Sequence, residues 1–370
     1  MKDLNICVKP ASAACNMACR YCFYEDVSRR RVSPLRGMMS LADALSLIDN
    51  VYGGLKRGDR VTFMFQGGEP TLAGLPFFQG FAEYALAPGR SKRVETHLSL
   101  QTNGLLLDDA FCDFLRRCDV LVGLSLDMDA AVHDKNRLDR GGAGTYARVE
   151  VARRHLHEHG CAYNVLSVLT REMARHPQRV WAFIREKGLQ YVQFIPCLGP
   201  LDGSEDFCAL TPGDFASFYT GLFGAWLADL KRGRYVSVKL FDDLINLLHS
   251  GAVNACGLTG RCSAQIVVEA DGSVYPCDFY CLDEYRAGNI LTDRIEDILA
   301  SPAVMAFLTR RVTKLPLCDG CRYSALCGGG CPRMRAHVCA SPDGGACGYQ
   351  RFLDACLNDM TALARSLRPI

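Results

Sequence analysis

Cys15-Asn16-Met17-Ala18-Cys19-Arg20-Tyr21-Cys22-Phe23-Tyr24 places three cysteines within a short loop that directly follows an apolar, strand-like run at residues 4–9. A structural zinc ion or an electron-transfer iron–sulfur cluster normally takes four protein ligands, whereas three cysteines leave one iron open to another molecule. The spacing leaves one alternative open, namely half of a zinc site that a distant residue such as His133 completes.

The cysteine content of the whole chain supports metal ligation. The 370 residues include 20 cysteines, which in a reducing compartment favours metal ligands over disulfides. Most of the remaining cysteines lie between Cys256 and Cys356. Six scattered ones are expected to be small buried hydrophobic side chains: Cys7, Cys112, Cys118, Cys161, Cys197 and Cys208.

Composition and charge exclude several classes of protein. Hydrophobic residues make up 49% and charged residues 22%, which is typical of a globular chain, and the net charge is only +2. This balance argues against a nucleic-acid partner or a membrane-surface partner. No apolar run reaches the roughly 18 residues of a membrane span, and the start of the chain lacks the pattern of a signal peptide. We therefore expect a cytoplasmic protein.

Strand and helix patterns alternate through the first part of the chain. Helical patterns begin at Ser40 and cover about 108–117, 145–158 and 177–187. Such β–α alternation predicts a parallel sheet with helices outside, either as a partial barrel or as a doubly wound sheet. The strand-like runs are residues 4–9, 61–65, 96–100, 120–126, 163–169 and 191–198.

The pattern changes after about residue 235. Residues 266–275 predict two short strands around an Asp271-Gly272 turn, and a helical stretch follows at 295–311. Beyond it lies a Cys- and Gly-rich region, for which we expect little regular structure and stabilisation by cysteine-bound metals. We therefore predict two domains, at residues 1–235 and 236–370.

The Cys-x3-Cys-x2-Cys-aromatic pattern resembles the signature of radical S-adenosylmethionine enzymes. The resemblance implies a partial (β/α)6 barrel in which Cys15, Cys19 and Cys22 bind a 4Fe–4S cluster, with S-adenosylmethionine as the cosubstrate on its fourth iron. The element Gln66-Gly67-Gly68-Glu69-Pro70 after the second strand is similar to the one that holds the methionine amino group. Two glycines allow close backbone approach, and a carboxylate can accept hydrogen bonds from an ammonium group.

Three later positions also match this family. The resemblance implies that Ser125 and Arg137 contact the ribose or the carboxylate of the cosubstrate, and that Leu198 lies beside its adenine. The alternatives are ordinary strand-end structure for Ser125 and Leu198, and a solvated loop charge for Arg137.

The cysteines of the second domain resemble the SPASM extension, which implies two auxiliary 4Fe–4S clusters and thus three in all. A pair of four-cysteine zinc sites is the alternative. Cys281, Cys339 and Cys356 have no place in this scheme, although Cys339 could replace Cys347. The implied ligands are Cys256, Cys262, Cys277 and Cys331 for the first auxiliary cluster, and Cys318, Cys321, Cys327 and Cys347 for the second.

Within that group the chain resembles anaerobic sulfatase-maturating enzymes, notably at residues 8–12, 65–74 and 271–280. The resemblance implies oxidation of a Cys or Ser in a Cys/Ser-x-Pro-x-Arg segment of an unfolded or nascent sulfatase to Cα-formylglycine, with an electron donor such as flavodoxin or ferredoxin. Asp278 would be the general base, and Tyr24 and Gln66 would orient the substrate. Met128 and Cys281 depart from the family pattern, which leaves substrate choice open.

Two other functions compete with this interpretation. One is a SPASM maturase that forms thioether or other crosslinks on a different peptide. Many such enzymes carry an N-terminal peptide-binding extension, whereas the first strand is expected here at Leu4. The other is a non-catalytic binding protein whose fold is stabilised by zinc ions.

Overall fold

The computed structural model describes residues 2–87, 93–253, 255–310, 315–340 and 346–367. It divides into two compact units, each built from several segments of the chain. The first unit comprises Met1–Ser125, Asp134–Tyr163 and Ala264–Arg310. The second unit comprises Leu126–His133, Asn164–Ser263 and Arg311–Ile370.

The first unit is built on a mixed sheet with the strand order β10-β9-β8-β1-β2-β3-β4. Neighbouring strands from β8 to β4 pair in parallel, whereas β9 pairs in antiparallel fashion with β8 and with β10. The strands are β1 (Asp3–Val8), β2 (Arg60–Phe65), β3 (Glu95–Thr102), β4 (Leu121–Ser125), β8 (Ile266–Val268), β9 (Ser273–Tyr275) and β10 (Gly288–Asn289).

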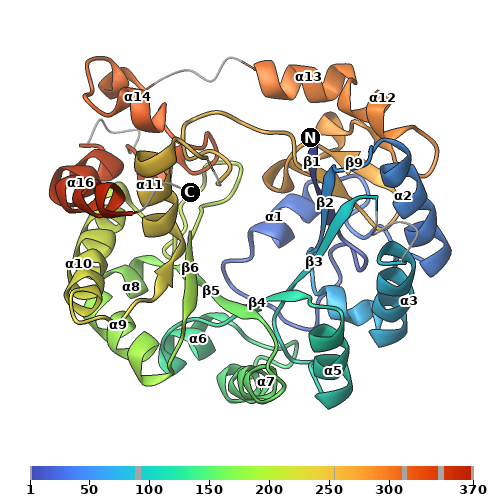
Figure 1. Ribbon diagram of the computed structural model, residues 1–370, viewed down its shortest axis with the longest axis horizontal. Coiled ribbons are helices and arrows are strands. Elements are labelled where there is room, and N and C mark those ends of the chain that lie inside the picture. Colours follow the sequence, from blue (N-terminus) through green and yellow to red (C-terminus); the bar gives the residue numbers. More distant parts are fainter. Residues whose placement is uncertain (1, 88–92, 254, 311–314, 341–345, 368–370) are drawn as a thin grey trace. The chain divides into compact units, whose positions relative to one another are not determined.

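Helices α2, α3 and α5 lie along one side of these strands (Figure 1). Side-chain caps fix two of their starts, since Ser40 accepts a hydrogen bond from the Asp43 amide and Asp108 accepts one from the Phe111 amide. Helix α6 (Ala130–Asn136) spans a boundary between the units. The other helical elements of the first unit are α1 (Phe23–Arg29), α2 (Leu41–Gly53), η1 (Pro70–Ala73), α3 (Leu75–Ala85), α5 (Asp109–Arg117), α7 (Tyr146–Glu158), η2 (Asp278–Tyr280), η3 (Asp283–Tyr285), α12 (Ile295–Leu299) and α13 (Pro302–Thr309).

Aromatic side chains fill the core between the sheet and α3. Phe63 and Phe65 on β2 are buried and contact Phe81 edge to face, with ring centroids 5.2 Å and 4.9 Å away. These two residues alternate with half-buried ones along β2, as expected for a strand with one face against helices.

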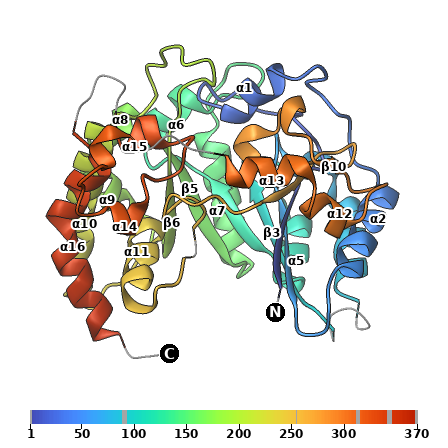
Figure 2. The same ribbon diagram turned by 90° about the horizontal axis from the view of Figure 1, so that it is seen from above.

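The second unit has a short parallel sheet of β5 (Tyr163–Leu169), β6 (Tyr191–Pro196) and β7 (Ser237–Val238). The long helices α10 and α16 lie side by side (Figures 1 and 2), where Phe215 stacks on Tyr349 at a centroid distance of 5.9 Å. The helical elements are α8 (Arg171–Ala174), α9 (Pro177–Glu186), α10 (Pro212–Leu230), α11 (Lys239–Ser250), η4 (Pro316–Cys318), α14 (Ser324–Cys327), α15 (Arg335–Val338) and α16 (Gly348–Ser366).

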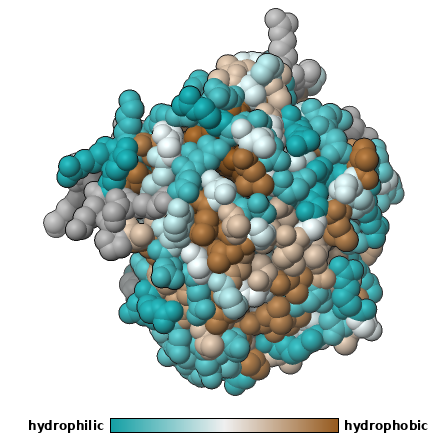
Figure 3. Space-filling view, turned by 90° about the vertical axis from the view of Figure 1, so that its right-hand side faces the viewer, coloured by the Kyte–Doolittle hydropathy of each residue, from teal (hydrophilic) through white to brown (hydrophobic). Residues whose placement is uncertain are grey.

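Within the described residues, no helix combines the length and apolar character needed to cross a membrane. On the face drawn in Figure 3, hydrophilic residues surround smaller groups of hydrophobic ones.

The structure confirms the six expected strands to within two residues at each end, as well as the hairpin around Gly272. The helical stretch expected at 295–311 is instead two helices. The break occurs because Pro302 starts α13, where a proline is tolerated, and Ser301 caps that helix by accepting a hydrogen bond from the Val304 amide. The helices among the described residues of the Cys- and Gly-rich region are short, but the long helix α16 after it was not predicted.

The Gly67-Gly68 turn after β2 packs on the loop that follows β1. The Gly68 amide donates to the Ser12 carbonyl at 2.8 Å, and Gly67 has a φ of +117°, which side-chain-bearing residues rarely adopt. A Cβ atom on Gly68 would lie 2.1 Å from the Ala14 carbonyl oxygen. The two loops therefore lie this close only because residue 68 has no side chain.

We predict that Gly68→Ala lowers the free energy of unfolding by about 1–3 kcal/mol, the usual cost of forcing extra atoms into a packed site. Gly53→Ala is the matched control, because a Cβ atom there meets nothing within 4 Å. Urea unfolding followed by circular dichroism measures both variants. Equal midpoints for the two would contradict the proposed backbone contact.

Candidate active site

The loop with Cys15, Cys19 and Cys22 joins β1 to α1, and Cys22 is the residue before the first turn of that helix. Its backbone is held by the segment after α6, since the Ala18 amide donates to the Leu138 carbonyl at 2.8 Å and the Arg20 amide to the Asn136 carbonyl at 2.9 Å. The three sulfur atoms are thus presented by a hydrogen-bonded loop at the carboxyl end of a parallel strand. This end of a parallel sheet is where active sites gather.

The sulfur atoms of Cys15, Cys19 and Cys22 are not spaced as three ligands of one zinc ion would be. Among the described residues, the three cysteines do not bring their Sγ atoms within 4.8 Å of one another. Sulfur ligands of one zinc ion lie about 3.8 Å apart, because each Zn–S bond is about 2.3 Å long. His133 is fully buried, and its Nδ1 accepts a hydrogen bond from the Asp127 amide at 3.2 Å. Half of a zinc site completed by His133 is therefore disfavoured.

Glu69 connects the carboxyl ends of β2 and β3. Its buried Oε1 accepts hydrogen bonds from Thr71 and from the Thr102 hydroxyl at 2.7 Å, while Oε2 accepts one from the Asn103 amide at 2.8 Å. A carboxylate oxygen has two lone pairs, so Oε2 keeps one for a further donor. Burial raises the pKa of Glu69, although the hydrogen bonds from Asn103, Thr71 and Thr102 oppose this shift.

Ser125 and Arg137 also lie in the first unit. The Ser125 hydroxyl at the end of β4 accepts a hydrogen bond from the Gln101 amide nitrogen at 2.9 Å. Arg137 is buried, and its guanidinium lies 5.4 Å from the ring centre of Tyr21 in the cysteine loop. Arg137 is therefore a buried residue beside the cysteine loop, and it is not a solvated loop charge. The half-buried Gln66 follows β2, and its amide donates to the Val8 carbonyl at 3.0 Å.

Leu198 is buried in the second unit, directly after β6. The next residue, Gly199, donates its amide to Nε2 of His337 at 3.1 Å, and Nδ1 of His337 donates to the Leu210 carbonyl at 2.9 Å. Burial lowers the pKa of His337, which suits a neutral ring with one donor and one acceptor nitrogen.

Asp278 forms an ion pair with Lys9, whose Nζ lies 2.5 Å from Oδ1 of the carboxylate. The side chain of Lys9 is fully buried, whereas that of Asp278 keeps 19% exposure. Burial disfavours the charge on Lys9, but the attraction of Asp278, together with Cys281, Tyr24 and Glu269, outweighs it and raises the pKa of the ammonium. Lys9 is therefore a permanent cation that fixes the position of the Asp278 carboxylate.

Tyr24 belongs to the same buried network. Its hydroxyl donates to Oε1 of Glu269, and Nζ of Lys9 lies 3.5 Å from its ring centre. Arg31 pairs with Glu269 at 2.9 Å, and the Ser12 hydroxyl donates to the other oxygen of Glu269, also at 2.9 Å. Two cations and two carboxylates thus balance one another next to the cysteine loop.

Sequence reasoning missed Lys9 and Glu269 as members of the site. Each is the first charged residue after a buried apolar strand, and Val8 pairs with Val268 in the register of β1 and β8. The signal in the sequence that could have indicated them is a charged residue directly after an apolar strand. Their meeting depends on the pairing of β1 with β8, which no local pattern reveals.

Cys281, which departs from the family pattern, is fully buried beside Lys9, with its Sγ 3.5 Å from Nζ. Burial raises its pKa to about 12, so it is a neutral thiol that packs against the network. Of the six scattered cysteines expected to be buried, five are buried and Cys118 is half-buried.

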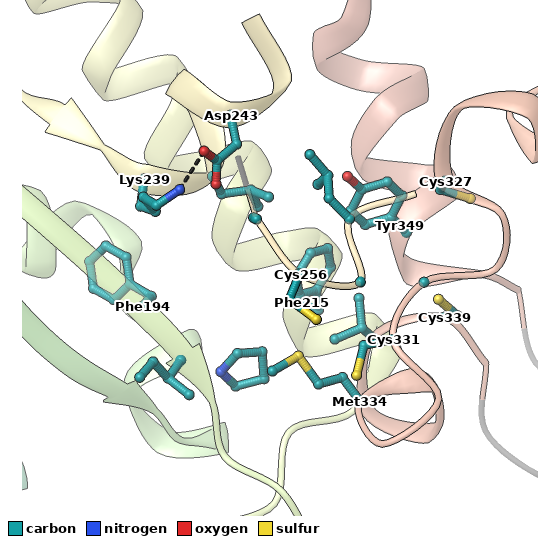
Figure 4. Close-up of a pocket in the computed structure, with 18 of the residues that line it drawn as sticks. Phe194, Phe215, Lys239, Asp243, Cys256, Cys327, Cys331, Met334, Cys339 and Tyr349 are labelled. Atoms are coloured by element: carbon teal, nitrogen blue, oxygen red, sulfur yellow. Dashed lines mark hydrogen bonds and ion pairs between the residues drawn. The ribbon is translucent and has the colours of Figure 1, made fainter. Parts of the chain in front are cut away.

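Cys256 and Cys331 line a cavity of about 200 Å³ in the second unit, shown in Figure 4. Their loops touch through glycines, since a Cβ atom on Gly257 would lie 2.7 Å from the Cβ of Cys331, and one on Gly260 would lie 2.3 Å from the Gly328 carbonyl oxygen. Cys262 lies in the same loop as Cys256. The fourth expected ligand of this group, Cys277, precedes Asp278 in the first unit.

A second, small cavity in the second unit is lined by five cysteines, which are Cys318, Cys321, Cys327, Cys339 and Cys347. Five thiols thus line this cavity, whereas the sequence predicts four ligands for the second auxiliary cluster. A hydrogen bond from the Cys339 thiol lowers the pKa of Cys347 to about 6 and raises that of Cys339. The thiols of Cys339 and Cys347 are therefore in direct contact, and the choice between them as the ligand stays a prediction.

Comparisons with known proteins match the chain along most of its length. The model of the radical SAM superfamily matches residues 10–176, and that of SPASM, an iron–sulfur cluster-binding domain, matches residues 246–322. The cysteine-type anaerobic sulfatase-maturating enzyme of Clostridium perfringens (strain ATCC 13124) is 38% identical, over 90% of both chains. The serine-type enzyme of Klebsiella pneumoniae is 29% identical, over 98% of this chain and 90% of that one.

A solved structure gives the same result for the fold. Native anSMEcpe with bound AdoMet and Cp18Cys peptide superposes with a TM-score of 0.89 at 34% identity, covering 99% of this chain and 100% of that one. The radical SAM α/β fold with a SPASM domain is thereby confirmed, and a non-catalytic zinc-stapled protein is not supported. The identity and coverage together show that this chain belongs to the anaerobic sulfatase-maturating enzymes of the radical SAM superfamily.

Proposed function

We propose that this enzyme oxidises the cysteine of a Cys-x-Pro-x-Arg segment in an unfolded or nascent sulfatase to Cα-formylglycine, in the cytoplasm. Cysteine is preferred to serine in this proposal because the cysteine-type relative is the more similar one, at 38% against 29% identity. The observation that carries it is the Lys9–Asp278 ion pair, which holds a partly exposed carboxylate beside the cysteine loop. The crosslinking of another peptide has no comparable support.

The proposal includes three 4Fe–4S clusters, on the ligand sets expected from the sequence, and the domain boundaries 1–235 and 236–370. When bound, the cluster on Cys15, Cys19 and Cys22 supplies an electron, drawn from a donor such as flavodoxin or ferredoxin, that cleaves S-adenosylmethionine to a 5′-deoxyadenosyl radical. Gly67, Gly68 and Glu69 would hold the methionine part of the cosubstrate. Ser125, Arg137 and Leu198 would hold the rest.

Removal of a hydrogen atom from Cβ leaves a thiol that must still lose its proton. We assign this proton to Asp278, because Lys9 holds its carboxylate in place and the side chain keeps 19% exposure, which leaves it accessible to a substrate. Tyr24 and Gln66 would orient the peptide. The remaining electron would pass to an auxiliary cluster, which leaves a thioaldehyde, and water would convert this to the aldehyde with release of hydrogen sulfide.

We predict about twelve irons per anaerobically reconstituted chain, because four irons belong to each of three clusters. Replacing Cys15, Cys19 and Cys22 by Ala should leave about eight irons and abolish 5′-deoxyadenosine formation. Cys118→Ala is the control, since this half-buried thiol lies outside every expected ligand set. Iron analysis and chromatography measure the two quantities. Continued cleavage by the triple variant would refute the cluster assignment.

Asp278→Asn should retain its iron and still form 5′-deoxyadenosine, yet lose about 10²–10⁴-fold in formylglycine rate on a Cys-x-Pro-x-Arg peptide, since an amide cannot accept the thiol proton. Mass spectrometry of the peptide and chromatography of the nucleoside follow both products in one reaction. Asp283→Asn, a change to an exposed aspartate of the same segment, is the control. A near-normal aldehyde yield from Asp278→Asn would mean that another group takes the proton.

Lys9→Met breaks the buried ion pair and should lower the free energy of unfolding by about 3 kcal/mol. This is the low end of the usual cost, and we choose it because Asp278 keeps 19% exposure. Methionine matches the length of the lysine chain, so the loss reports mainly on the charge. Lys56→Met, at an exposed site, is expected to be neutral. Chemical denaturation compares the two, and equal midpoints would show that the pair contributes little.

A further inference from the structure

Helices α5 and α7 lie side by side in the first unit (Figure 1), and a group of histidine and aspartate side chains connects them, far along the chain from every cysteine motif. Oδ1 of Asp109 on α5 lies 2.9 Å from Nδ1 of His155 and 3.1 Å from Nε2 of His159. The two histidines are four residues apart on α7, so their rings lie on one face of the helix, nearly parallel at 13° with centroids 6.5 Å apart.

Three potential ligand atoms therefore converge on one point. They all lie within 4.8 Å of one another, and this is the group of three among the described residues that meets this condition. Ligand atoms of one tetrahedral zinc ion lie about 3.3 Å apart, because Zn–N and Zn–O bonds are about 2.0–2.2 Å long. The observed spacing of 2.9 Å and 3.1 Å is thus close to that of a first coordination shell.

A fourth residue orients the arrangement. Nδ1 of His159 lies 2.9 Å from Oδ1 of Asp113, one turn further along α5. A hydrogen bond from Nδ1 to a carboxylate is the usual support of a histidine that binds metal through Nε2, because it fixes the tautomer and the ring orientation. Nε2 lies at hydrogen-bond distance, 3.1 Å, from Oδ1 of Asp109, and in the tautomer with the proton on Nδ1 its lone pair is available to a cation.

His155 supports the same conclusion. Its Nδ1 is shielded from solvent and makes no hydrogen bond of acceptable geometry, although Oδ1 of Asp109 is only 2.9 Å away. A carboxylate oxygen that approaches two imidazole nitrogens without a good hydrogen bond to one of them resembles two ligands of a common ion.

We propose that Asp109, His155 and His159 form a binding site for one divalent transition-metal ion of the zinc type. Two imidazole nitrogens and a carboxylate oxygen suit zinc, and water would complete its tetrahedral shell. The donors contain no sulfur, so the site is chemically distinct from the cysteine sites. The Asp109 side chain is 74% exposed, so ions in solution can reach its carboxylate.

The bound ion would cross-link α5 to α7, two helices that are separated in the chain by β4 and α6. Because the ion binds the folded arrangement, and the unfolded chain scatters the three ligands, it stabilises the fold. The site therefore has a structural role and is independent of peptide oxidation.

Equilibrium dialysis of the iron-loaded holoenzyme against zinc chloride at pH 8, followed by elemental analysis of zinc and iron, tests the proposal. We expect the His155→Gln/His159→Gln variant to bind one zinc fewer per chain than the parent. Asp109→Asn, a change at a mostly exposed side chain, should weaken the same binding without any risk to folding. His157→Gln is the matched control, an exposed histidine between the two ligands, and it should keep the full zinc content.

Two further measurements separate this site from the cysteine chemistry. Iron content and 5′-deoxyadenosine formation should be unchanged in all variants, and zinc should raise the melting temperature of the parent but not of the double variant. Equal zinc binding by parent and double variant, no zinc binding by the parent, or a loss in His157→Gln equal to that of the double variant would each overturn the proposal. None of these results would bear on the oxidation of the sulfatase peptide.

Discussion

The buried ion pair between Lys9 and Asp278 is the interaction on which the centre of the first unit depends. A lysine with no exposure is tolerable only where carboxylates surround it, and Lys9 has Asp278 at 2.5 Å and Glu269 at 3.9 Å. Both carboxylates come from the segment that includes β8 and β9. Their charges therefore require this late segment to pair with the first strand of the chain, since an unpaired Lys9 in the core would cost several kcal/mol.

The same part of the molecule is rigid because the strand ends are hydrogen-bonded to one another. Glu69 links the end of β2 to that of β3, and the amides of Gly68 and Glu69 donate to the carbonyls of Ser12 and Ala14 at 2.8 Å. The cysteine loop, the glycine turn and the Thr102-Asn103 end of β3 are thus connected through backbone and carboxylate contacts. Reacting groups that such contacts hold in place lose little entropy when a ligand binds, which is the physical basis of preorganisation.

The parts of this fold that the sequence predicted are those that depend on nearby residues. Strand 163–169 alternates in burial and was placed with its observed ends, and Ser40 caps α2 as its position before Leu41 indicates. The three cysteines proposed as ligands stand out in the sequence because three thiols at this spacing have few other uses. The Lys9–Glu269 contact could not be predicted, because it depends on the register of β1 against β8 and on no local pattern. The helix break before Pro302 was a local signal that was available but was not used.

The neighbours of Asp278 also bear on the role of general base that we propose for it. A lone carboxylate in an apolar site would take up a proton and could then accept none from a thiol, because burial disfavours its charged form. Lys9 places a positive charge 2.5 Å from the Asp278 carboxylate, and Arg31 places one 2.9 Å from that of Glu269. Transfer of a proton from a substrate thiol to a carboxylate becomes easier once the thiol has become more acidic. Removal of a hydrogen atom from the adjacent Cβ has that effect on a thiol, since the radical delocalises onto sulfur. In the proposed mechanism, proton transfer to Asp278 therefore follows the removal of the hydrogen atom.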